Sequence, residues 1–254
     1  MSTTEAIYDE AAQDWQRTGP VLLSDFTARP FLLDWCEPVR GADVLDLGCG
    51  EGYVTRQLAA RGAKSVLGID LSSEMIEGAK KATVDHETAL EFRVGDASKV
   101  EELPAQSYDL VVAVFLFNYV EIDAMRKIIA NVRRALRPGG RFIFSVPHPS
   151  LPFLCKQQKP FFFDPEGADY FGGRDQTFEG QIWRRDGKSV PVRCVHKTQS
   201  DYFKALKDAG FTSIPDVEEL RVTDEHVAFD PEFFTPLKGL PLHQAFRVEV
   251  PEEV

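Results

Sequence analysis

Three aspartates lie in or directly after short apolar runs: Asp46 in VLDLG, Asp70 in SVLGID and Asp96 in LEFRVGD. Carboxylates can accept hydrogen bonds from the hydroxyls of a ribose or from the amino group of an adenine. The turn after the first run, GCGEG (48–52), carries three glycines, which allow the backbone to approach a ligand closely. These residue types at this spacing indicate a site for a nucleoside-bearing ligand.

The glycine spacing separates two kinds of nucleoside ligand. A dinucleotide-binding turn has the pattern G-x-G-x-x-G and holds a pyrophosphate at the start of the next helix. Here the pattern is G-x-G-x-G, and Asp46 and Glu51 place carboxylates where they would repel two phosphates. A nucleoside with a positive or amino-acid-bearing tail is therefore favoured. A dinucleotide-dependent oxidoreductase and a non-catalytic, cofactor-binding accessory subunit remain the alternatives.

Histidines are the candidates for accepting a proton from a nucleophile. His148 lies between two prolines, just after the apolar run RFIFSV (141–146), and we predict that it contacts the substrate and acts as the catalytic residue. His196 is included among the substrate-binding candidates, although it shares a predicted strand face with apolar residues that favour simple packing. His243, in GLPLHQAF, is the third candidate.

Aromatic and amide side chains provide the other predicted substrate contacts. Asn118 and Tyr119 follow the apolar run at 108–117, and Tyr170 lies in an aromatic segment. The four cysteines form no CxxC and no Cys/His cluster with metal-ligand spacing, so we expect no metal site.

An alternation of strands and helices must position these residues. Apolar runs bounded by turn signals predict strands at 44–48, 65–70, 90–96, 108–117 and 141–146. Between them, helical spacing of apolar residues predicts helices at 53–62, 72–82 and 121–140. This alternation predicts an α/β fold whose parallel sheet is covered by helices on both faces. Ligands of such sheets lie at the carboxyl ends of the strands.

The rest of the chain departs from this rhythm. Two helices are predicted at 4–17 and 24–36, a two-residue hairpin at Asp186-Gly187, a helix within 198–211 beginning after Thr198 or Ser200, and final strands at 217–222 and 243–250. The segment 147–197 is too long for a simple connector and is rich in Pro, Gly and aromatic residues, which predicts either a lid or a small subdomain. One domain is expected, made of an N-terminal helical cap (1–40), a cofactor-binding core (41–146), a substrate lid (147–197) and a C-terminal helix with the final strands (198–254).

Composition narrows the possible partners. The chain has 254 residues, of which 43% are hydrophobic and 27% charged, as in ordinary globular domains. With 29 basic and 40 acidic residues the net charge is -11, so we expect neither a nucleic acid nor an anionic membrane as partner. No apolar run reaches the roughly 18 residues that span a membrane. A cytoplasmic protein with free thiols is expected, as a monomer or homodimer.

The motifs together resemble a known family. Five segments resemble, in order and spacing, the successive motifs of class I S-adenosylmethionine-dependent methyltransferases. They are VLDLGCGEG (44–52), GIDLS (68–72), VGDA (94–97), YDLVVAVFLFNYV (108–120) and ALRPGGRFIFSVPH (135–148). The resemblance covers about residues 40–148. It implies a Rossmann-like, mostly parallel sheet of seven strands in the order 3-2-1-4-5-7-6, with S-adenosyl-L-methionine as the cofactor.

The same resemblance implies a set of cofactor-binding residues. They are Tyr8, Asp46, Gly48, Cys49, Gly50, Asp70, Leu71, Met75, Asp96, Ala97 and Phe115. Within this set the loop after the first strand would line the methionine part, Asp70 the ribose, Asp96 the adenine edge, and Phe115 the sulfonium region. Cys49 stands where such loops have small residues, so a role as a small buried side chain is expected.

Segments outside the core suggest the kind of acceptor. SVPHPS (145–150), YFGGRD (170–175), IWRRDGK (182–188) and HKTQSDYFKALKDAGF (196–211) are similar to small-molecule methyltransferases of bacterial secondary metabolism, the toxoflavin type among them. This implies methyl transfer to an O or N atom of a small molecule. The branch that methylates amino groups of DNA or of protein glutamine has the motif Asn/Asp-Pro-Pro-aromatic after the fourth strand. This chain reads AVFLFNYV at that place, which argues against membership of that branch.

Overall fold

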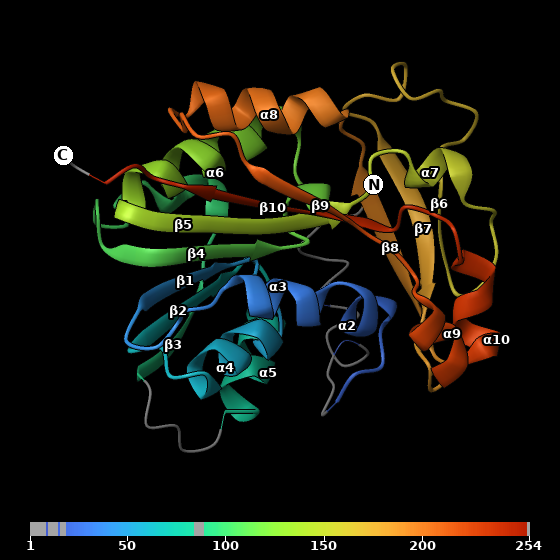
Figure 1. Cartoon of the computed structure of the whole chain (residues 1–254), viewed down its shortest axis with the longest axis horizontal. Coiled ribbons are helices and arrows are strands. Elements are labelled where there is room, and N and C mark those ends of the chain that lie inside the picture. Colours follow the sequence, from blue (N-terminus) through green and yellow to red (C-terminus); the bar gives the residue numbers. More distant parts are fainter. Residues whose placement is uncertain (1–8, 10–14, 16–18, 84–88, 253–254) are drawn as a thin grey trace.

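The computed structural model describes residues 9, 15, 19–83 and 89–252, and the side chains of 100–102 are not described (Figure 1). Apart from Asp9 and Trp15, the helix predicted at 4–17 lies outside these residues, and so does Tyr8.

A seven-stranded sheet forms the centre of the molecule (Figure 1). In spatial order its strands are β3 (Ala89–Val94), β2 (Ser65–Asp70), β1 (Asp43–Leu47), β4 (Tyr108–Val114), β5 (Leu136–Pro147), β10 (His243–Glu249) and β9 (Asp216–Leu220). The first five are parallel to one another, whereas β10 is antiparallel to both of its neighbours. Counted within this sheet alone, β9 is the sixth strand and β10 the seventh. The predicted order 3-2-1-4-5-7-6 is therefore confirmed, and the labels differ only because three strands of another sheet intervene along the chain.

Helices cover both faces of this sheet (Figure 1). One face carries α3 (Arg29–Trp35), α4 (Tyr53–Ala60) and α5 (Ser73–Lys81), and the other carries α6 (Ile122–Ala135) and α8 (Gln199–Asp208). Leu45 and Leu47 of β1 pack into the core under α6 and α8, whereas Val44 packs into the core under α3 and α4. Because side chains alternate along a strand, Asp46 shares the face of Val44 and points toward α4.

Local sequence explains where the helices that flank the ligand edge begin. The Ser72 hydroxyl oxygen accepts the Met75 N–H (3.1 Å) and caps α5. Thr198, rather than Ser200, precedes α8, and Asp201 accepts hydrogen bonds from the Thr198 N–H (3.0 Å) and hydroxyl (2.7 Å).

The segment after β5 builds a second, smaller sheet beside the first (Figure 1). It contains α7 (Leu151–Leu154), β6 (Phe161–Asp164), β7 (Thr177–Trp183) and β8 (Ser189–Val195), and its three strands are antiparallel. The turn between β7 and β8 differs from the predicted two-residue hairpin. The Arg184 N–H donates to the Lys188 carbonyl (2.8 Å), so residues 185–187 form a three-residue loop, in which Gly187 has φ +86°.

This smaller sheet shares a core with both ends of the chain. The remaining helices are α2 (Leu23–Thr27), α9 (Asp224–Phe229) and α10 (Pro231–Phe234), with short 3₁₀ turns η1 (Ala97–Glu102), η2 (Phe117–Tyr119) and η3 (Thr235–Leu237). Phe161, Phe163 and Phe178 pack in one apolar cluster with Leu22 and Phe234. The aromatic residues of the segment therefore fill a core of their own.

Candidate functional site

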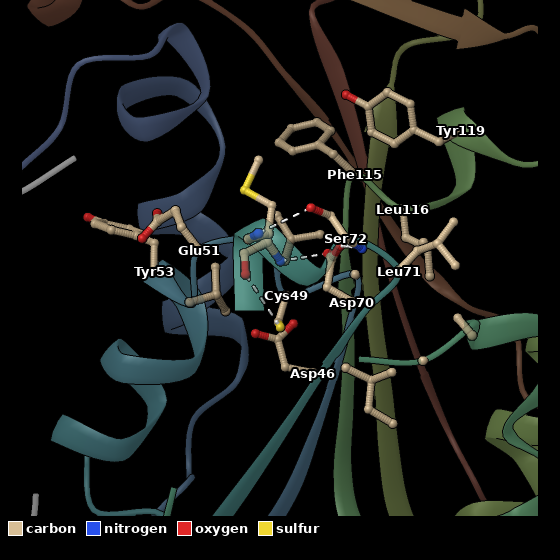
Figure 2. Close-up of a pocket in the computed structure, with 18 of the residues that line it drawn as sticks. Asp46, Cys49, Glu51, Tyr53, Asp70, Leu71, Ser72, Phe115, Leu116 and Tyr119 are labelled. Carbon is tan, nitrogen blue, oxygen red and sulfur yellow. Dashed lines mark hydrogen bonds between the residues drawn. The ribbon is translucent and has the colours of Figure 1, made fainter. Parts of the chain in front are cut away.

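A cavity of about 220 Å³ lies at the carboxyl ends of β1, β2, β3 and β4 (Figure 2). Ten of the eleven predicted cofactor-binding residues line it: Asp46, Gly48, Cys49, Gly50, Asp70, Leu71, Met75, Asp96, Ala97 and Phe115. The eleventh, Tyr8, lies outside the described residues. The structure thus brings together side chains that are separated by up to 69 positions, as the parallel sheet predicts.

The loop after β1 has a conformation that requires glycine. Gly48, Gly50 and Gly52 have φ of +70°, +54° and +80°. The Gly48 N–H donates to the Ile69 carbonyl of β2 (2.8 Å), which holds the loop against the neighbouring strand. A Cβ on Gly52 would lie 2.8 Å from the ring of Phe92. The loop therefore presents backbone, rather than side chains, to the cavity.

Asp70 organises the next wall of the cavity (Figure 2). Its Oδ2 accepts the Gly50 N–H (2.8 Å) and its Oδ1 accepts the Ser72 N–H (3.0 Å), so one carboxyl joins the loop after β1 to the start of α5. Burial raises its pKa, although these N–H donors oppose the shift. A carboxylate has about four acceptor positions, so Asp70 can still accept a hydrogen bond from a ligand.

Asp46 is a carboxyl group buried at the floor of the cavity, with a side chain 1% exposed. The Thr55 hydroxyl donates to its Oδ2 (2.6 Å). Burial raises the pKa of Asp46 to about 7; the Thr55 hydrogen bond lowers it, the Asp70 charge raises it and Arg29 lowers it. A cation placed in the cavity would stabilise the ionised form.

Asp96 and Glu51 are held by partners at the cavity rim. The Asp96 carboxylate accepts hydrogen bonds from the Ser98 N–H (2.9 Å) and hydroxyl (2.7 Å) and pairs with Lys99 (3.3 Å). These partners outweigh its desolvation and lower its pKa. Glu51 is buried and pairs with Arg56 (2.7 Å).

Known proteins resemble this chain in sequence and in fold. A family model described as "Methyltransferase domain" matches residues 44–140. The chain is 32% identical over 217 residues to an uncharacterized protein of Haemophilus influenzae, with 82% of each chain covered. It is 36% identical over 184 residues to a malonyl-[acyl-carrier protein] O-methyltransferase of Halalkalibacterium halodurans, with 66% of each covered. A solved S-adenosylmethionine-dependent methyltransferase from Mesorhizobium loti superposes with a TM-score of 0.65 at 29% identity, covering 87% of this chain and 96% of that one.

The chain belongs to the class I S-adenosylmethionine-dependent methyltransferases. The predicted fold, enzyme class and cofactor are thereby confirmed, and neither alternative, the oxidoreductase or the non-catalytic subunit, is retained. The cavity residues fit this cofactor. The loop after β1 leaves space for it, Asp70 has acceptor positions for ribose hydroxyls, and Asp46 offers a buried carboxyl to its cationic end.

A second cavity of about 70 Å³ shares part of its lining with the first. Trp15, Arg29, Phe115 and Tyr119 line both cavities of the methyltransferase. The remaining lining residues of the smaller cavity are Leu23, Ser24, Asn118, Pro147, Phe161, Phe163, Ile182, Val192 and His243. The smaller cavity is therefore bounded by α2, by the residues after β4, by the second sheet and by the start of β10.

Phe115, labelled at the larger cavity in Figure 2, also lines the smaller one. It follows β4 with φ +59°, a left-handed conformation that costs a bulky residue about 1–3 kcal/mol. Its N–H donates to the Ser145 carbonyl of β5 (3.0 Å), and its ring meets the His243 ring edge-on, with centroids 5.0 Å apart. The Arg29 guanidinium lies 5.5 Å from the ring centroid. These contacts fix an aromatic face where the two cavities meet.

Asn118 and Tyr119, both predicted to bind substrate, line the smaller cavity, but His148 lines neither cavity. The His148 Nδ1 accepts the Ser150 N–H (3.1 Å), and its Nε2 lies 3.0 Å from the Glu219 carboxylate of β9. Both ring nitrogens of the predicted catalytic histidine are thus engaged within the protein, away from the cavities.

Tyr170 and His196 also lie away from both cavities. The His196 Nε2 is 2.9 Å from the Tyr170 carbonyl, and its ring stacks on Phe178 at 5.5 Å. The Tyr170 hydroxyl oxygen accepts the Gln199 N–H at the start of α8 (2.8 Å). Both side chains attach the second sheet to the rest of the molecule.

The sequence patterns indicated neither Arg29, which lines both cavities, nor Lys197, which contacts a residue of the larger cavity's lining. Arg29 donates to the Ser24 hydroxyl and to Asp25 (3.0 Å), and only the i, i+4 spacing of Asp25 and Arg29 hints at this pair. Lys197 is fully buried, and its ammonium donates to the Val120 carbonyl (2.5 Å), beside η2. Burial lowers the pKa of Lys197 to about 8.

The described part of the chain offers no second kind of site among metal centres, membrane spans or disulfides. Its His, Cys, Asp and Glu residues form no group of three or more that could hold a metal ion. Among the described helices, none combines the length and apolarity that crossing a membrane requires. All four cysteines lie in the described part and are free; Cys49 is buried, and burial raises its thiol pKa well above the usual value.

Proposed function

We propose that this methyltransferase transfers a methyl group to an O or N atom of a small-molecule acceptor whose reactive end enters the smaller cavity. The observation that carries the proposal is the shared wall: Phe115, Tyr119 and Arg29 line both cavities. A donor in the larger cavity and an acceptor in the smaller one would meet across these side chains.

The cofactor supplies a methyl carbon activated by a sulfonium. The protein's contribution is chiefly placement, which can supply up to about 7–11 kcal/mol when two reactants are held in line. In this proposal Asp70 accepts the ribose hydroxyls, Asp96 faces the adenine edge, and Asp46 faces the cationic end. Aromatic faces such as that of Phe115 attract a nearby cation by about 0.5–2 kcal/mol.

The second sheet acts in this proposal as the substrate lid. Phe161, Phe163, Ile182 and Val192 supply an apolar wall, which would exclude water and favour a planar or apolar acceptor. The H. halodurans relative is named as an O-methyltransferase. That name supports an oxygen atom as the methyl acceptor, and the resemblance of the lid segment to small-molecule enzymes supports an acceptor from secondary metabolism.

The proposal is tested by incubating the purified enzyme with methyl-labelled S-adenosylmethionine and, separately, the small-molecule and macromolecular fractions of a cell extract. We expect label in a small molecule. Label only in protein or nucleic acid, or in neither fraction, would refute the proposal.

A matched pair of variants links the acceptor to the cavity. Phe163→Leu alters the wall of the smaller cavity, whereas Phe171→Leu changes an aromatic residue of the same segment that is 78% exposed and lines neither cavity. We expect the first variant to change the KM for the acceptor at least several-fold with unchanged affinity for S-adenosylhomocysteine, and the second to change neither.

A further inference from the structure

His243 is one of the residues that line the smaller cavity, and one of its ring nitrogens is buried and has no partner among the described residues. The residue begins β10 and is only 3% exposed. Its Nε2 lies 3.1 Å from the Thr27 hydroxyl oxygen. Within the described part of the chain, no group forms a hydrogen bond with its Nδ1.

The neighbouring hydroxyl determines which ring nitrogen carries the proton. The Thr27 hydroxyl donates its single hydrogen to the Leu23 carbonyl (3.0 Å). Its oxygen can therefore only accept from His243, which requires an N–H at Nε2. In a neutral imidazole the other nitrogen is then unprotonated, so the His243 Nδ1 keeps a free lone pair.

The ring stays neutral across the physiological range. Burial, together with the smaller effects of the Arg29 and His148 charges, lowers the pKa of His243 to about 3. The Nδ1 lone pair is therefore available at any pH at which the enzyme is folded and active.

A second unpartnered acceptor lines the same cavity. Asn118 is 2% exposed, and its side-chain oxygen has no hydrogen-bond partner in the described part of the chain. A buried acceptor left without a donor costs about 1–3 kcal/mol. Two such atoms favour a ligand that brings hydrogen-bond donors into this cavity.

The charge beside the cavity narrows the kind of donor. An ammonium would face the Arg29 guanidinium, which also lines the cavity, and a carboxylate, although Arg29 would attract it, brings no hydrogen to the Asn118 and His243 acceptors. A neutral hydroxyl supplies a hydrogen-bond donor without bringing a second positive charge to Arg29.

We propose that His243 is the catalytic base of this enzyme and that the acceptor is a neutral hydroxyl compound carrying a second hydrogen-bond donor. The reacting hydroxyl donates to the His243 Nδ1, and the second donor binds the Asn118 oxygen. The inference rests on the proposed function, because it assigns the nucleophile of the same reaction.

The step balances without another reactant. A lone pair of the hydroxyl oxygen forms the new O–C bond to the methyl group, and the C–S bond breaks with its electron pair passing to sulfur. The hydroxyl proton moves to the His243 Nδ1, and the imidazolium then loses a proton to solvent. Because the oxygen's proton becomes strongly acidic as the new bond forms, even a weak base can accept it.

The protonation state of His243 can be tested without an acceptor. Long-range ¹H–¹⁵N spectra of the folded enzyme with ¹⁵N-labelled histidine report which ring nitrogens carry hydrogen, and comparison with His243→Phe assigns the resonances. We expect a neutral ring protonated at Nε2 from pH 6 to 8. A hydrogen on Nδ1, or an imidazolium in this range, would overturn the proposal.

The role in recognition can be tested with catechol as the probe and 1,2-difluorobenzene as a ligand of similar shape without donors. Titrations are made with S-adenosylhomocysteine saturating. We expect wild type to bind catechol at least tenfold more tightly, His243→Phe to lose this preference, and the matched change His196→Phe, outside both cavities, to keep it. A preference that survives in His243→Phe sinks the inference.

Thr27→Val serves if His243→Phe does not fold. It removes the acceptor that fixes the tautomer, so the Nε2–H resonance should give way to a tautomer mixture and the catechol preference should weaken; an unchanged tautomer would contradict the argument. Failure of the proposed function looks different, because wild type would then label no small molecule in an extract.

Discussion

The affinity for the cofactor should depend on the ionisation of Asp46. This carboxyl is buried at the floor of the larger cavity, and burial raises its pKa to about 7. S-Adenosylhomocysteine carries an ammonium that the ionised form would attract and the protonated form would not. Binding should therefore tighten as the pH rises toward 7.

The size of the effect follows from the pKa. If only the ionised form binds, the apparent Kd is multiplied by 1 + 10^(pKa − pH), which is about 33 at pH 5.5 and about 2 at pH 7.0 for a pKa of about 7. The affinity should rise about 16-fold over this interval. The α-amino group of the ligand, with a pKa of roughly 7.7–8.0, stays protonated throughout.

Calorimetric titration of S-adenosylhomocysteine at several pH values measures this rise. Asp46→Asn should bind more weakly and nearly independently of pH, and its residual slope gives the contribution of Asp70 and the other cavity carboxyls. Thr55→Val should move the rise to higher pH, because the Thr55 hydrogen bond lowers the pKa of Asp46. Equal slopes for wild type and Asp46→Asn would refute the reasoning.

The same group makes a signed prediction for stability. Because the folded-state pKa is raised from 3.8 to about 7, the folded protein binds more protons than the unfolded chain between these values, and stability falls as the pH rises through this window. The penalty approaches about 4 kcal/mol at full ionisation. Urea unfolding without ligand at pH 8 should show Asp46→Asn to be more stable than wild type, although it binds the cofactor less well.

Three further changes probe the loop and the lid. Asp70→Ala removes acceptor positions for two hydroxyls, and with about 1.5 kcal/mol for each charged hydrogen bond we expect at least 100-fold weaker S-adenosylhomocysteine binding by calorimetry. Gly68→Ala puts a Cβ 2.9 Å from the Cys49 sulfur, and we expect urea unfolding to show a loss of about 1–3 kcal/mol. Lys197→Met removes a group whose pKa is lowered from 10.5 to about 8, so the stability of wild type relative to this variant should rise by up to about 3 kcal/mol between pH 8 and 10.5.

Each of these predictions has a control. Asp70→Asn keeps the shape and should lose less affinity than Asp70→Ala; equal losses would mean that shape is irrelevant and charge alone matters. Adding Cys49→Ala should restore part of the stability lost in Gly68→Ala. If stability did not recover, the loss would not come from a clash with the Cys49 sulfur. A difference between wild type and Lys197→Met that stays constant with pH would show that the Lys197 pKa is not lowered.

The sequence predicted the sheet and the larger cavity because their signals are local. Each of Asp46, Asp70 and Asp96 lies at or near the end of its own strand, and a parallel sheet brings such ends to one edge whatever the loops do. The apolar runs predicted the strands, and the glycine spacing predicted the loop after β1. Neither prediction required knowledge of a tertiary contact.

The smaller cavity was not predictable in this way, as His243, which lines it, and His148, which does not, show. In the β5–β10 pair His243 lies opposite Pro147, so His148 is its near neighbour in space. Which ring faces the cavity depends on the register of that pair and on the path of the chain after β5, which local patterns do not specify. The sequence therefore indicated the correct end of the sheet, but the prediction favoured His148 over His243 as the histidine that contacts the substrate.

The residues that line the two cavities come from different stretches of the sequence. Every residue that lines the larger cavity lies between Trp15 and Ile128, whereas the smaller cavity also takes Pro147, His243 and four residues of the second sheet. In the proposed assignment, substitutions after position 128 would therefore change the acceptor site without altering contacts to the methyl donor. Exchanging that stretch between relatives would then be a direct route, for evolution or for engineering, to new acceptors on an unchanged donor site.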